Sequence, residues 1–322
     1  MLKVVSLFAG CGGAELGMLG GFIFNNEEYA KLPYEIVYAL DIDQKAINTH
    51  KLNFDCNDVV VGDIRDIHEG TIPNHDVLVG GFPCQSFSTV NPTKDPTDDR
   101  ANLYKEMVRI VNAKKPKVFV AENVKGFMTL QKGKILEQVK ADFEQAGYTI
   151  THRLLNAAEY GVPQRRERVF LVGVRNDLDI GFSFPEPTTS ETLVPLSVAV
   201  PKLAIDEQKY YFSERAVQGM KNAKNNMKRG LAQNLDEPCL TVTSHLAKVS
   251  LNSRDPVLLV DPEKELYRRF TPREAARIQS FPDCFEFAGS EADAYRQIGN
   301  AIAPVMFWQI SKSIAEMLGA YV

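Results

Sequence analysis

The most informative segment of this chain is Leu7-Phe8-Ala9-Gly10-Cys11-Gly12-Gly13. It directly follows an apolar run, Lys3–Phe8, and precedes a helical pattern, Ala14–Leu19. Glycines between a strand and a helix let the backbone approach a ligand at the helix N-terminus. An ordinary strand-to-helix turn would have a similar composition. The segment therefore predicts the first turn of an α/β sheet, with a ligand-binding turn as the sharper interpretation.

One position separates this turn from the fingerprint that binds dinucleotides. That fingerprint has a glycine where this chain has Glu15. An acidic residue there suits a nucleoside ligand without a pyrophosphate, such as S-adenosylmethionine. The same difference, together with the lack of a recognisable hydride-transfer motif, disfavours a nicotinamide oxidoreductase.

Outward from this turn, short apolar runs alternate with helical patterns up to about residue 175. Helical patterns cover Ala101–Ala113 and Lys134–Ala146. The expected strands are Lys3–Phe8, Glu35–Leu40, Asp58–Val61, Val77–Val79, Val118–Ala121, Tyr148–Leu155 and Arg168–Val174. This alternation predicts a parallel, doubly wound α/β sheet, which binds ligands at the carboxyl ends of its strands.

Acidic residues follow the second and third expected strands. Asp41 is placed to bind ribose hydroxyls, as carboxylates at this position do in nucleotide-binding sheets. Asp63 could accept a hydrogen bond from an adenine amino group, and Ile64 could pack on the ring. Each acid alone would be an ordinary cap or turn residue. Their order along successive strand ends favours a nucleoside site.

The fourth expected strand leads into Val79-Gly-Gly-Phe-Pro-Cys84-Gln-Ser-Phe-Ser88. A lone cysteine is usually a small buried hydrophobe. Here the glycines, the proline and the polar residues make a poor core strand, so we interpret the segment as a loop with a reactive thiol. The polar, proline-bearing stretch Asn91–Arg100 that follows is typical of a lid.

Two further polar motifs lie at the last expected strands. Val120-Ala-Glu122-Asn-Val124 places a glutamate at a strand end, where a partly dry site could keep it protonated to donate to a heteroaromatic nitrogen. Gln164-Arg-Arg-Glu-Arg168 runs into the final strand. Arginines that enter a buried strand need anionic or carbonyl partners, and a solvated basic turn is the alternative interpretation.

Composition excludes several classes of protein. The 322 residues are 44% hydrophobic and 24% charged, which is typical of a globular chain of about two domains. We expect no membrane span, because no apolar run approaches the ~18 residues required, and no secretory signal. The five cysteines are widely spaced, without a CxxC pair or neighbouring histidines, so we expect free thiols, no metal and a cytoplasmic location.

The charge is uneven along the chain. The net charge is −4, yet the segment from Lys202 to Arg254 holds nine basic and five acidic residues. It lies within an irregular stretch from about 186 to 265, rich in Asn, Lys and Ser, that follows a linker-like passage, Phe184–Ser190, and is expected to form a second, smaller domain. A locally positive surface is what phosphate binding requires, although solvated lysines would give the same count.

Two helices are expected near the C-terminus. Thr271 is a plausible N-cap, with Pro272 as the first helical residue and Glu274 closing a capping box. The amphipathic segment Ala303–Leu318 is expected to pack back on the sheet.

Taken together and in order, these segments resemble the DNA cytosine-5 methyltransferases. The resemblance spans residues 3 to about 310 and is closest to the compact bacterial restriction-modification type. It is carried by Phe8–Gly13, Gly81–Ser86, Glu122–Val124, Gln164–Arg168, Arg273-Glu-Ala-Ala-Arg-Ile-Gln-Ser-Phe-Pro282 and Ile298-Gly-Asn300.

The resemblance implies a Rossmann-like sheet dependent on S-adenosylmethionine and a second, smaller, irregular target-recognition domain. The catalytic and cofactor-binding domain would comprise residues 1–185 and 290–322. The target-recognition domain would comprise residues 186–265, which no family motif matches. A hinge or connecting helix region would comprise residues 266–289.

The resemblance also implies a role for each matched residue. Cys84 would add to C6 of a flipped cytosine, Glu122 would hold the N3 and amino edge, and Arg168 would bind O2, with Arg166 supporting the site. Position 41 is Asp where family members often have Glu. The cofactor residues implied are Phe8, Gly10, Gly12, Asp41, Ile42, Asp63, Ile64, Leu103 and Asn300.

Duplex DNA is the partner implied, and the base must be flipped out of the stack to be reached. The candidate DNA-binding residues are Gln85, Ser86, Ser88, Lys228, Arg229, Ser244, His245 and Lys248. We expect a monomer associated with the nucleoid, without a membrane partner, in a cell that could also hold a cognate restriction endonuclease.

Two alternatives remain at this point. A tRNA cytosine methyltransferase shares the family motifs, and methyl incorporation into tRNA rather than DNA would identify it. A catalytically inactive DNA-binding regulator is the other, but such a protein has no need of Cys84, Glu122, Arg166 and Arg168 together.

Overall fold

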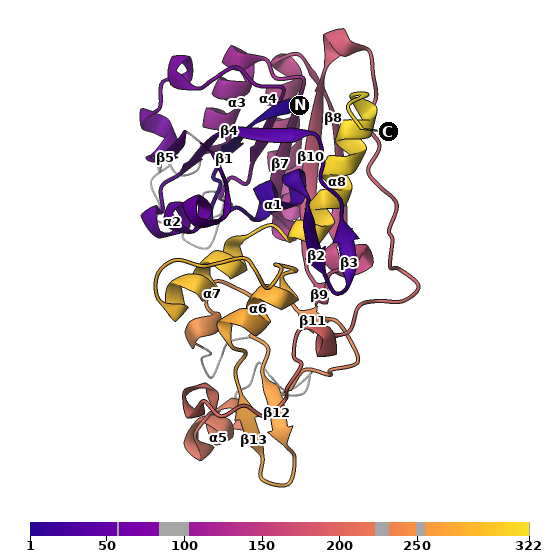
Figure 1. The fold of residues 1–322 in the computed structure, drawn as a ribbon. Helices are drawn as coiled ribbons and strands as arrows, with labels where there is room; N and C mark the ends of the chain where they lie inside the picture. The colour runs from indigo at the N-terminus through magenta and orange to yellow at the C-terminus, as the bar shows by residue number, and fades with distance from the viewer. Residues whose placement is uncertain (57, 84–102, 223–231, 249–254, 322) are drawn as a thin grey trace.

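The computed structural model describes residues 1–56, 58–83, 103–222, 232–248 and 255–321 (Figure 1). A sheet covered by helices forms the upper part of the molecule in this view, and the segments after about residue 190 form most of the lower part. The C-terminal helix returns from the lower part to the sheet, as expected for Ala303–Leu318.

The upper part is built on a seven-stranded sheet with the order β5-β4-β1-β6-β7-β10-β8. Each expected strand is present, and its ends differ from the sequence prediction by at most three residues. The bounds are β1 (Leu2–Leu7), β4 (Tyr34–Asp41), β5 (Val59–Val61), β6 (Val77–Gly80), β7 (Val118–Val124), β8 (Tyr148–Asn156) and β10 (Glu167–Arg175).

The strand order reverses between β1 and β6, which pair in parallel from Val4↔Val77 to Leu7↔Gly80. Open α/β sheets bind their ligands in the crevice at such a reversal. The topology therefore places the turn after β1 and the residues after β6 at the edge where a ligand is expected.

The prediction of an entirely parallel sheet is wrong at one strand. β10 is antiparallel to both of its neighbours, β7 and β8. A parallel crossover needs roughly a dozen or more residues, usually including a helix. The connection from β8 to β10 consists of residues 157–166, which is too short for a helical crossover.

Helices cover both faces of the sheet. The expected helices are confirmed at α1 (Gly13–Leu19), α3 (Leu103–Lys114), α4 (Lys134–Gln145) and α8 (Pro304–Met317), and α2 (Gln44–Asn53) follows β4. Val4 packs on the side of α1 and α8, whereas its neighbour Val5 packs on the side of α3 and α4. Both faces of the central strands are thus buried, which explains their continuous apolar runs.

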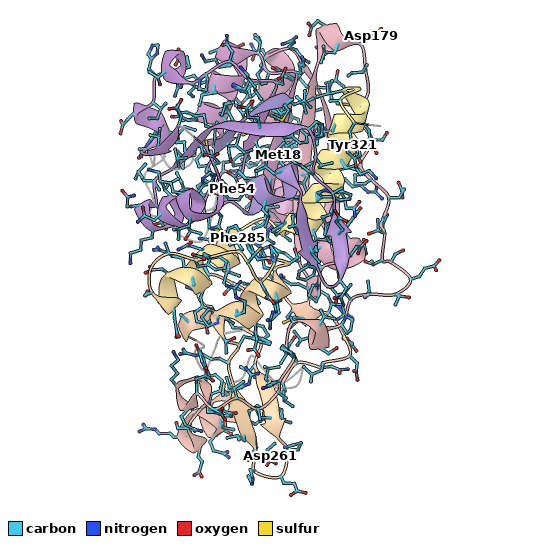
Figure 2. All side chains as sticks on the ribbon, viewed as in Figure 1. Met18, Phe54, Asp179, Asp261, Phe285 and Tyr321 are labelled. Atoms are coloured by element: carbon cyan, nitrogen blue, oxygen red, sulfur yellow. The ribbon has the colours of Figure 1, made fainter. Side chains whose placement is uncertain are left out.

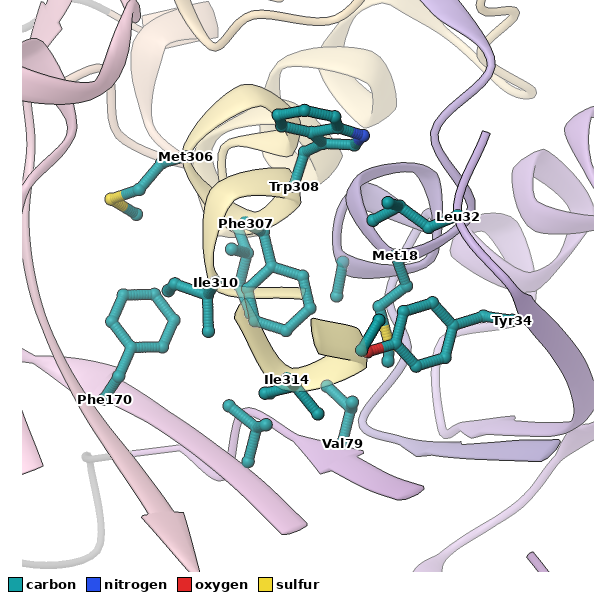
Figure 3. Packing of buried hydrophobic residues seen from close by; sticks show 14 of the residues in the cluster. Met18, Leu32, Tyr34, Val79, Phe170, Met306, Phe307, Trp308, Ile310 and Ile314 are labelled. Carbon is teal, nitrogen blue, oxygen red and sulfur yellow. The ribbon is translucent and has the colours of Figure 1, made fainter. Parts of the chain in front are cut away.

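Helix α8 packs against one face of the sheet. Figure 3 shows Phe307, Ile310 and Ile314 of this helix packed among Met18, Val79 and Phe170. Burying each such side chain contributes about 1.5–3 kcal/mol. This packing holds the end of the chain on the sheet.

The lower part contains short elements. Helix α6 begins with the predicted capping box, in which Thr271 Oγ1 accepts from Glu274 N and Glu274 accepts from Thr271 N. The bounds are β9 (Gln164–Arg165), β11 (Cys239–Leu240), α5 (Glu214–Asn222), β12 (Leu258–Asp261), β13 (Leu266–Arg268), α6 (Pro272–Ile278) and α7 (Glu291–Asn300). A hairpin of β2 (Phe22–Phe24) and β3 (Glu27–Tyr29) beside α8 was not foreseen.

One face of α2 packs against the segment that leads into α7. Phe54 and Phe285 lie close together at this junction in Figure 2, with ring centroids 6.0 Å apart. The Asn53 side chain donates to Glu286 O and accepts from Glu286 N, and Thr49 Oγ1 accepts from Ala288 N. These contacts fix α7 beside the carboxyl edge of the sheet.

Candidate active site

A cavity of about 670 Å³ opens at the carboxyl ends of β1, β4, β6 and β7. Its volume lies within the range of small-molecule sites. The sequence-predicted site residues that line it are Phe8, Gly10, Asp41, Ile42, Glu122, Arg166, Arg168 and Asn300. Asp41 and Glu122 meet at the sheet edge as their strand-end positions predicted, and Asn300 joins them from the end of α7.

The turn after β1 forms one wall of this cavity. Gly10 and Gly12 adopt positive φ angles of 57° and 99°, which glycine reaches without strain. A Cβ at Gly12 would lie 2.1 Å from a ring carbon of Phe54, so a side chain there would displace that ring. Phe8 also has a positive φ, 56°. Such a conformation is costly for a phenylalanine and is concentrated at functional sites.

Asp41 is fixed in place by the same turn. One carboxylate oxygen accepts from Gly10 N at 2.8 Å and the other from Asp43 N at 2.8 Å. Burial raises the pKa of Asp41, and these two N–H donors counteract the shift. A carboxylate has about four lone-pair sites, so two remain available for the hydroxyls of a ribose.

The apolar side of the site is built from several elements. Phe8 and Leu103 pack against the same hydrophobic cluster, to which the buried Ile64 belongs. Ile42, in contrast, is 69% exposed and lines the cavity, as an apolar residue that contacts a ligand would. Gly12, Asp63, Ile64 and Leu103 do not line the cavity within the described part of the chain.

The carboxylate of Asp63 already has partners. Arg65 donates to it from its backbone N at 3.0 Å and from Nε at 2.9 Å. The hydrogen bonds from Arg65 lower the pKa of Asp63. Asp63 is thus held ionised at the end of β5, with its geometry set by the neighbouring arginine.

Glu122 and Arg168 form an ion pair inside the cavity. Arg168 Nε lies 2.9 Å from Glu122 Oε1, and the two side chains are 13% and 14% exposed. Burial raises the pKa of Glu122, while Arg168 and then Arg166 oppose that shift. The pair results from the antiparallel register of β7 and β10, which sets Phe170 opposite Glu122 and Arg168 opposite Val124.

The residues after β6 pass beside this pair. A Cβ at Gly81 would lie 3.3 Å from Glu122 Oε2, so a side chain there would press on that carboxylate. Asn123 Nδ2 donates to Phe82 O at 3.0 Å and fixes the same segment. Pro83, the last described residue before Cys84, also lines the cavity. Cys84, Gln85, Ser86, Ser88, Lys228 and Arg229 lie outside the described residues.

Arg166 is 2% exposed and binds backbone carbonyls rather than an acid. Its guanidinium donates to Val242 O at 3.2 Å, Gly299 O at 2.9 Å and Ala301 O at 3.0 Å. This arginine therefore holds the segment on either side of Asn300, which ends α7 at the cavity.

The described residues contain no cluster of three or more His, Cys, Asp or Glu side chains that could hold a metal ion. The four cysteines among them, Cys11, Cys56, Cys239 and Cys284, are free thiols. No helix in the described ranges is long and apolar enough to cross a membrane.

The family model for C-5 cytosine-specific DNA methylases matches residues 2–316. The chain belongs to this family. It is a DNA cytosine-5 methyltransferase, and its central sheet is the Rossmann-like sheet of methyltransferases that use S-adenosylmethionine. This agrees with the resemblance found in the sequence motifs.

Relatives of this methyltransferase match over nearly the whole chain. It is 38% identical to the type II methyltransferase M.NgoFVII of Neisseria gonorrhoeae, covering 97% of this chain and 86% of that protein. It is 35% identical to M.NlaX of Neisseria lactamica, covering 99% and 98%. A prophage-encoded DNA modification methyltransferase from E. coli has the same fold, with a TM-score of 0.77 at 24% identity, covering 99% of this chain and 100% of that one.

The remaining DNA-binding candidates of the methyltransferase lie near α7. A Cβ on Gly299 would lie 2.2 Å from Thr243 C and 2.3 Å from Ser244 N, so α7 packs directly on this backbone. Ser244 is half-buried and His245 is exposed. Lys248 ends a short 3₁₀ helix, Leu246–Lys248.

The sequence did not reveal the roles of three residues at the site. Arg296, one turn before Asn300, lines the cavity and pairs with Asp43 at 2.9 Å. Gln164 and Gln279 are fully buried and hydrogen-bonded to each other. The alternation of Gln164, Arg166 and Arg168 was a usable signal, because residues two apart share one side of an extended chain.

Proposed function

We propose that this methyltransferase transfers a methyl group from S-adenosylmethionine to C5 of a cytosine flipped out of a short, specific duplex DNA sequence. The observation that carries the proposal is the Glu122–Arg168 pair, which lies in one cavity with Phe8, Asp41 and Asn300. A nucleoside-type site and a pair suited to a pyrimidine edge thus share one enclosed space.

Glu122 and Arg168 would recognise the cytosine by its polar edge. A carboxyl with a raised pKa holds a proton to higher pH than an ordinary glutamate and can donate it to N3. Arg168 would donate to O2 while keeping Glu122 oriented. Arg166 would support both by fixing the backbone around them.

Cys84 would be the nucleophile. C5 of cytosine is a poor nucleophile, and addition of a thiolate at C6 converts it into an enamine-like carbon. The C6–S bond would form as the ring accepts a proton at N3 from Glu122. C5 would then take the methyl group and leave S-adenosylhomocysteine. Loss of the C5 proton and of the thiolate, with return of the N3 proton to Glu122, would restore the ring. A thiol of ordinary pKa, about 8.5, is only partly ionised near neutrality.

The cavity fits the cofactor, which supplies an electrophilic methyl group when bound. Phe8 would stack on the adenine, with Ile42 on its other face and Ile64 and Leu103 behind the pocket wall. Asp41 would hold the ribose hydroxyls through its remaining lone pairs. Asp63 would accept from the adenine amino group, and Gly10, Gly12 and Asn300 would shape the methionine end.

The DNA would lie against the lower part of the molecule. We propose residues 1–185 and 290–322 as the catalytic domain, 186–265 as the target-recognition domain and 266–289 as their connection. Gln85, Ser86 and Ser88, which come just after Cys84 in the sequence, would contact the DNA. Base and phosphate contacts would come from Lys228, Arg229, Ser244, His245 and Lys248. The enzyme would act as a monomer on nucleoid DNA in the cytoplasm, with any cognate endonuclease acting separately.

The nucleophile is tested by replacing Cys84 with Ser. A duplex with 5-fluorocytosine at the target retains the adduct, because fluorine cannot leave C5 as the proton does. We expect wild type to form a denaturation-resistant complex with this duplex, and Cys84→Ser to form none while binding S-adenosylmethionine with unchanged affinity. Turnover by the serine variant at the wild-type rate would refute the assignment.

A further inference from the structure

Residue Val242 is held on both sides of its backbone by buried side chains. Gln164 Oε1 accepts from Val242 N at 2.9 Å, and Arg166 donates to Val242 O at 3.2 Å. The parallel pairing of β9 with β11 ends at Arg165↔Leu240. Past Leu240 the two backbones no longer pair, and the side chains of Gln164 and Arg166 bind the backbone of Val242 instead.

The same glutamine reaches the segments on the other side of the site. Gln164 Nε2 donates to Ile278 O at 3.2 Å and to the side-chain oxygen of Gln279. Gln279 Nε2 donates in turn to Ala301 O, which also accepts from Arg166. Gln164 and Gln279 are both 0% exposed, so their geometry is protected from water. Low local dielectric strengthens such a network.

This network lies between the proposed base readers and the cytosine pocket. Val242 precedes Ser244 and His245 by two and three residues, and Arg166 precedes Arg168 by two. A shift of the recognition segment must therefore move the side chains of Gln164 and Arg166. Because these residues lead directly into β10, that shift reaches the Arg168–Glu122 pair.

We propose that Gln164, supported by Gln279, is a positioning residue that makes the pocket at Glu122 and Arg168 depend on correct seating of the Thr241–Ser244 segment on DNA. The proposal rests on the proposed function of residues 186–265 in reading the target. It assigns to Gln164 a part in discrimination between target and near-target sites, beyond holding the fold together.

A surface contact between the same two segments provides a matched control. Arg165 pairs with Glu237 at 3.1 Å, with side chains 39% and 59% exposed. Exposed pairs of this kind contribute little to rigidity. Glu237→Gln therefore removes a link between the same segments while leaving the buried network intact.

The target sequence is first determined for the wild-type enzyme. The experiment then compares methylation of the target duplex with that of a fully paired duplex in which one base pair of the target has been substituted. For Gln164→Leu we expect the ratio of kcat/KM values to fall roughly 3- to 30-fold, the size of other network couplings, with S-adenosylmethionine affinity within about twofold of wild type. Gln279→Leu should lower the ratio in the same direction. Glu237→Gln should leave it unchanged.

A structural role alone would lower both rates together, through the fraction of folded enzyme, and leave the ratio constant. An unchanged ratio in soluble, folded Gln164→Leu would overturn the inference while the proposed function stood. Should Gln164→Leu fail to fold, Gln164→Glu keeps the acceptor for Val242 N, and the same ratio decides. A wild-type enzyme without sequence preference would overturn both proposals.

Discussion

Among single residues, Glu122 is the one whose protonation state governs the proposed chemistry. Burial raises its pKa, and Arg168, 2.9 Å away, works in the opposite direction. If the protonated form binds the cytosine, kcat/KM falls as pH rises through this raised pKa. Burial extends the pH range in which Glu122 would keep a proton to donate, and the neighbouring arginine narrows that range.

Replacing Arg168 with Met should raise the pKa of Glu122 further, because the cation that favours the carboxylate is removed. Carboxyl ¹³C NMR of selectively labelled enzyme measures this titration. Lys125→Met is the matched control, since Lys125 pairs with the exposed Glu167 at 2.8 Å rather than with Glu122. A pKa that is unchanged or lower in Arg168→Met would contradict this account of the pair.

At the scale of elements, an ion pair fixes α6 to the strand before it. Arg268 is 0% exposed, and its two terminal nitrogens each lie 2.7 Å from a carboxylate oxygen of Glu274. Glu274 is also the capping-box residue that accepts from Thr271 N. One carboxylate therefore begins the helix and neutralises a fully buried arginine.

Arg268→Met should lower the free energy of unfolding by about 3–5 kcal/mol, because it leaves the Glu274 charge buried without its partner. In the double variant Arg268→Met/Glu274→Gln, no charge is left buried and the amide oxygen still accepts from Thr271 N. Part of the lost free energy of unfolding should therefore be recovered. Urea unfolding of the three proteins measures both effects. A double variant less stable than the single one would show that the buried charge is not the cause.

The elements were predictable where local signals agreed. The capping box at Thr271 and the seven strands follow from spacing and apolar runs. The antiparallel insertion of β10 was not foreseen, because strand direction depends on how the connection folds rather than on the strand's own residues. The bonds of Gln164 likewise join segments more than 70 residues apart along the chain, as with Val242, which no local pattern reveals.

For the molecule as a whole, the sequence motifs predicted more of the residues at the cavity than of those on the proposed DNA-binding surface. Phe8, Asp41 and Glu122 meet at one cavity as strand-end topology predicts, and Asn300, known only from the motif resemblance, joins them from the end of α7. The surface proposed to read DNA comes from segments whose sequence has no periodic pattern. The local excess of positive charge between Lys202 and Arg254 is the one sequence signal for it.

Replacing Arg229 tests whether this positively charged segment binds DNA by its bases or by its phosphates. If it reads a base, Arg229→Ala should alter the sequence preference at one position, at a cost of about 1–3 kcal/mol in discrimination. The salt dependence of DNA affinity should then change little. Binding and methylation across a panel of single-substitution duplexes at several salt concentrations measure both. Uniform weakening on every duplex, with a shallower salt slope, would make Arg229 a phosphate contact instead.

The proposed activity is methylation of cytosine at C5 within one DNA sequence. Bisulfite sequencing of mixed-sequence plasmid DNA, incubated with the enzyme and S-adenosylmethionine, tests it most directly. We expect protected cytosines in a single recurring context, which also supplies the target sequence. Unprotected plasmid DNA, from enzyme that binds S-adenosylmethionine and methylates tRNA, would contradict it.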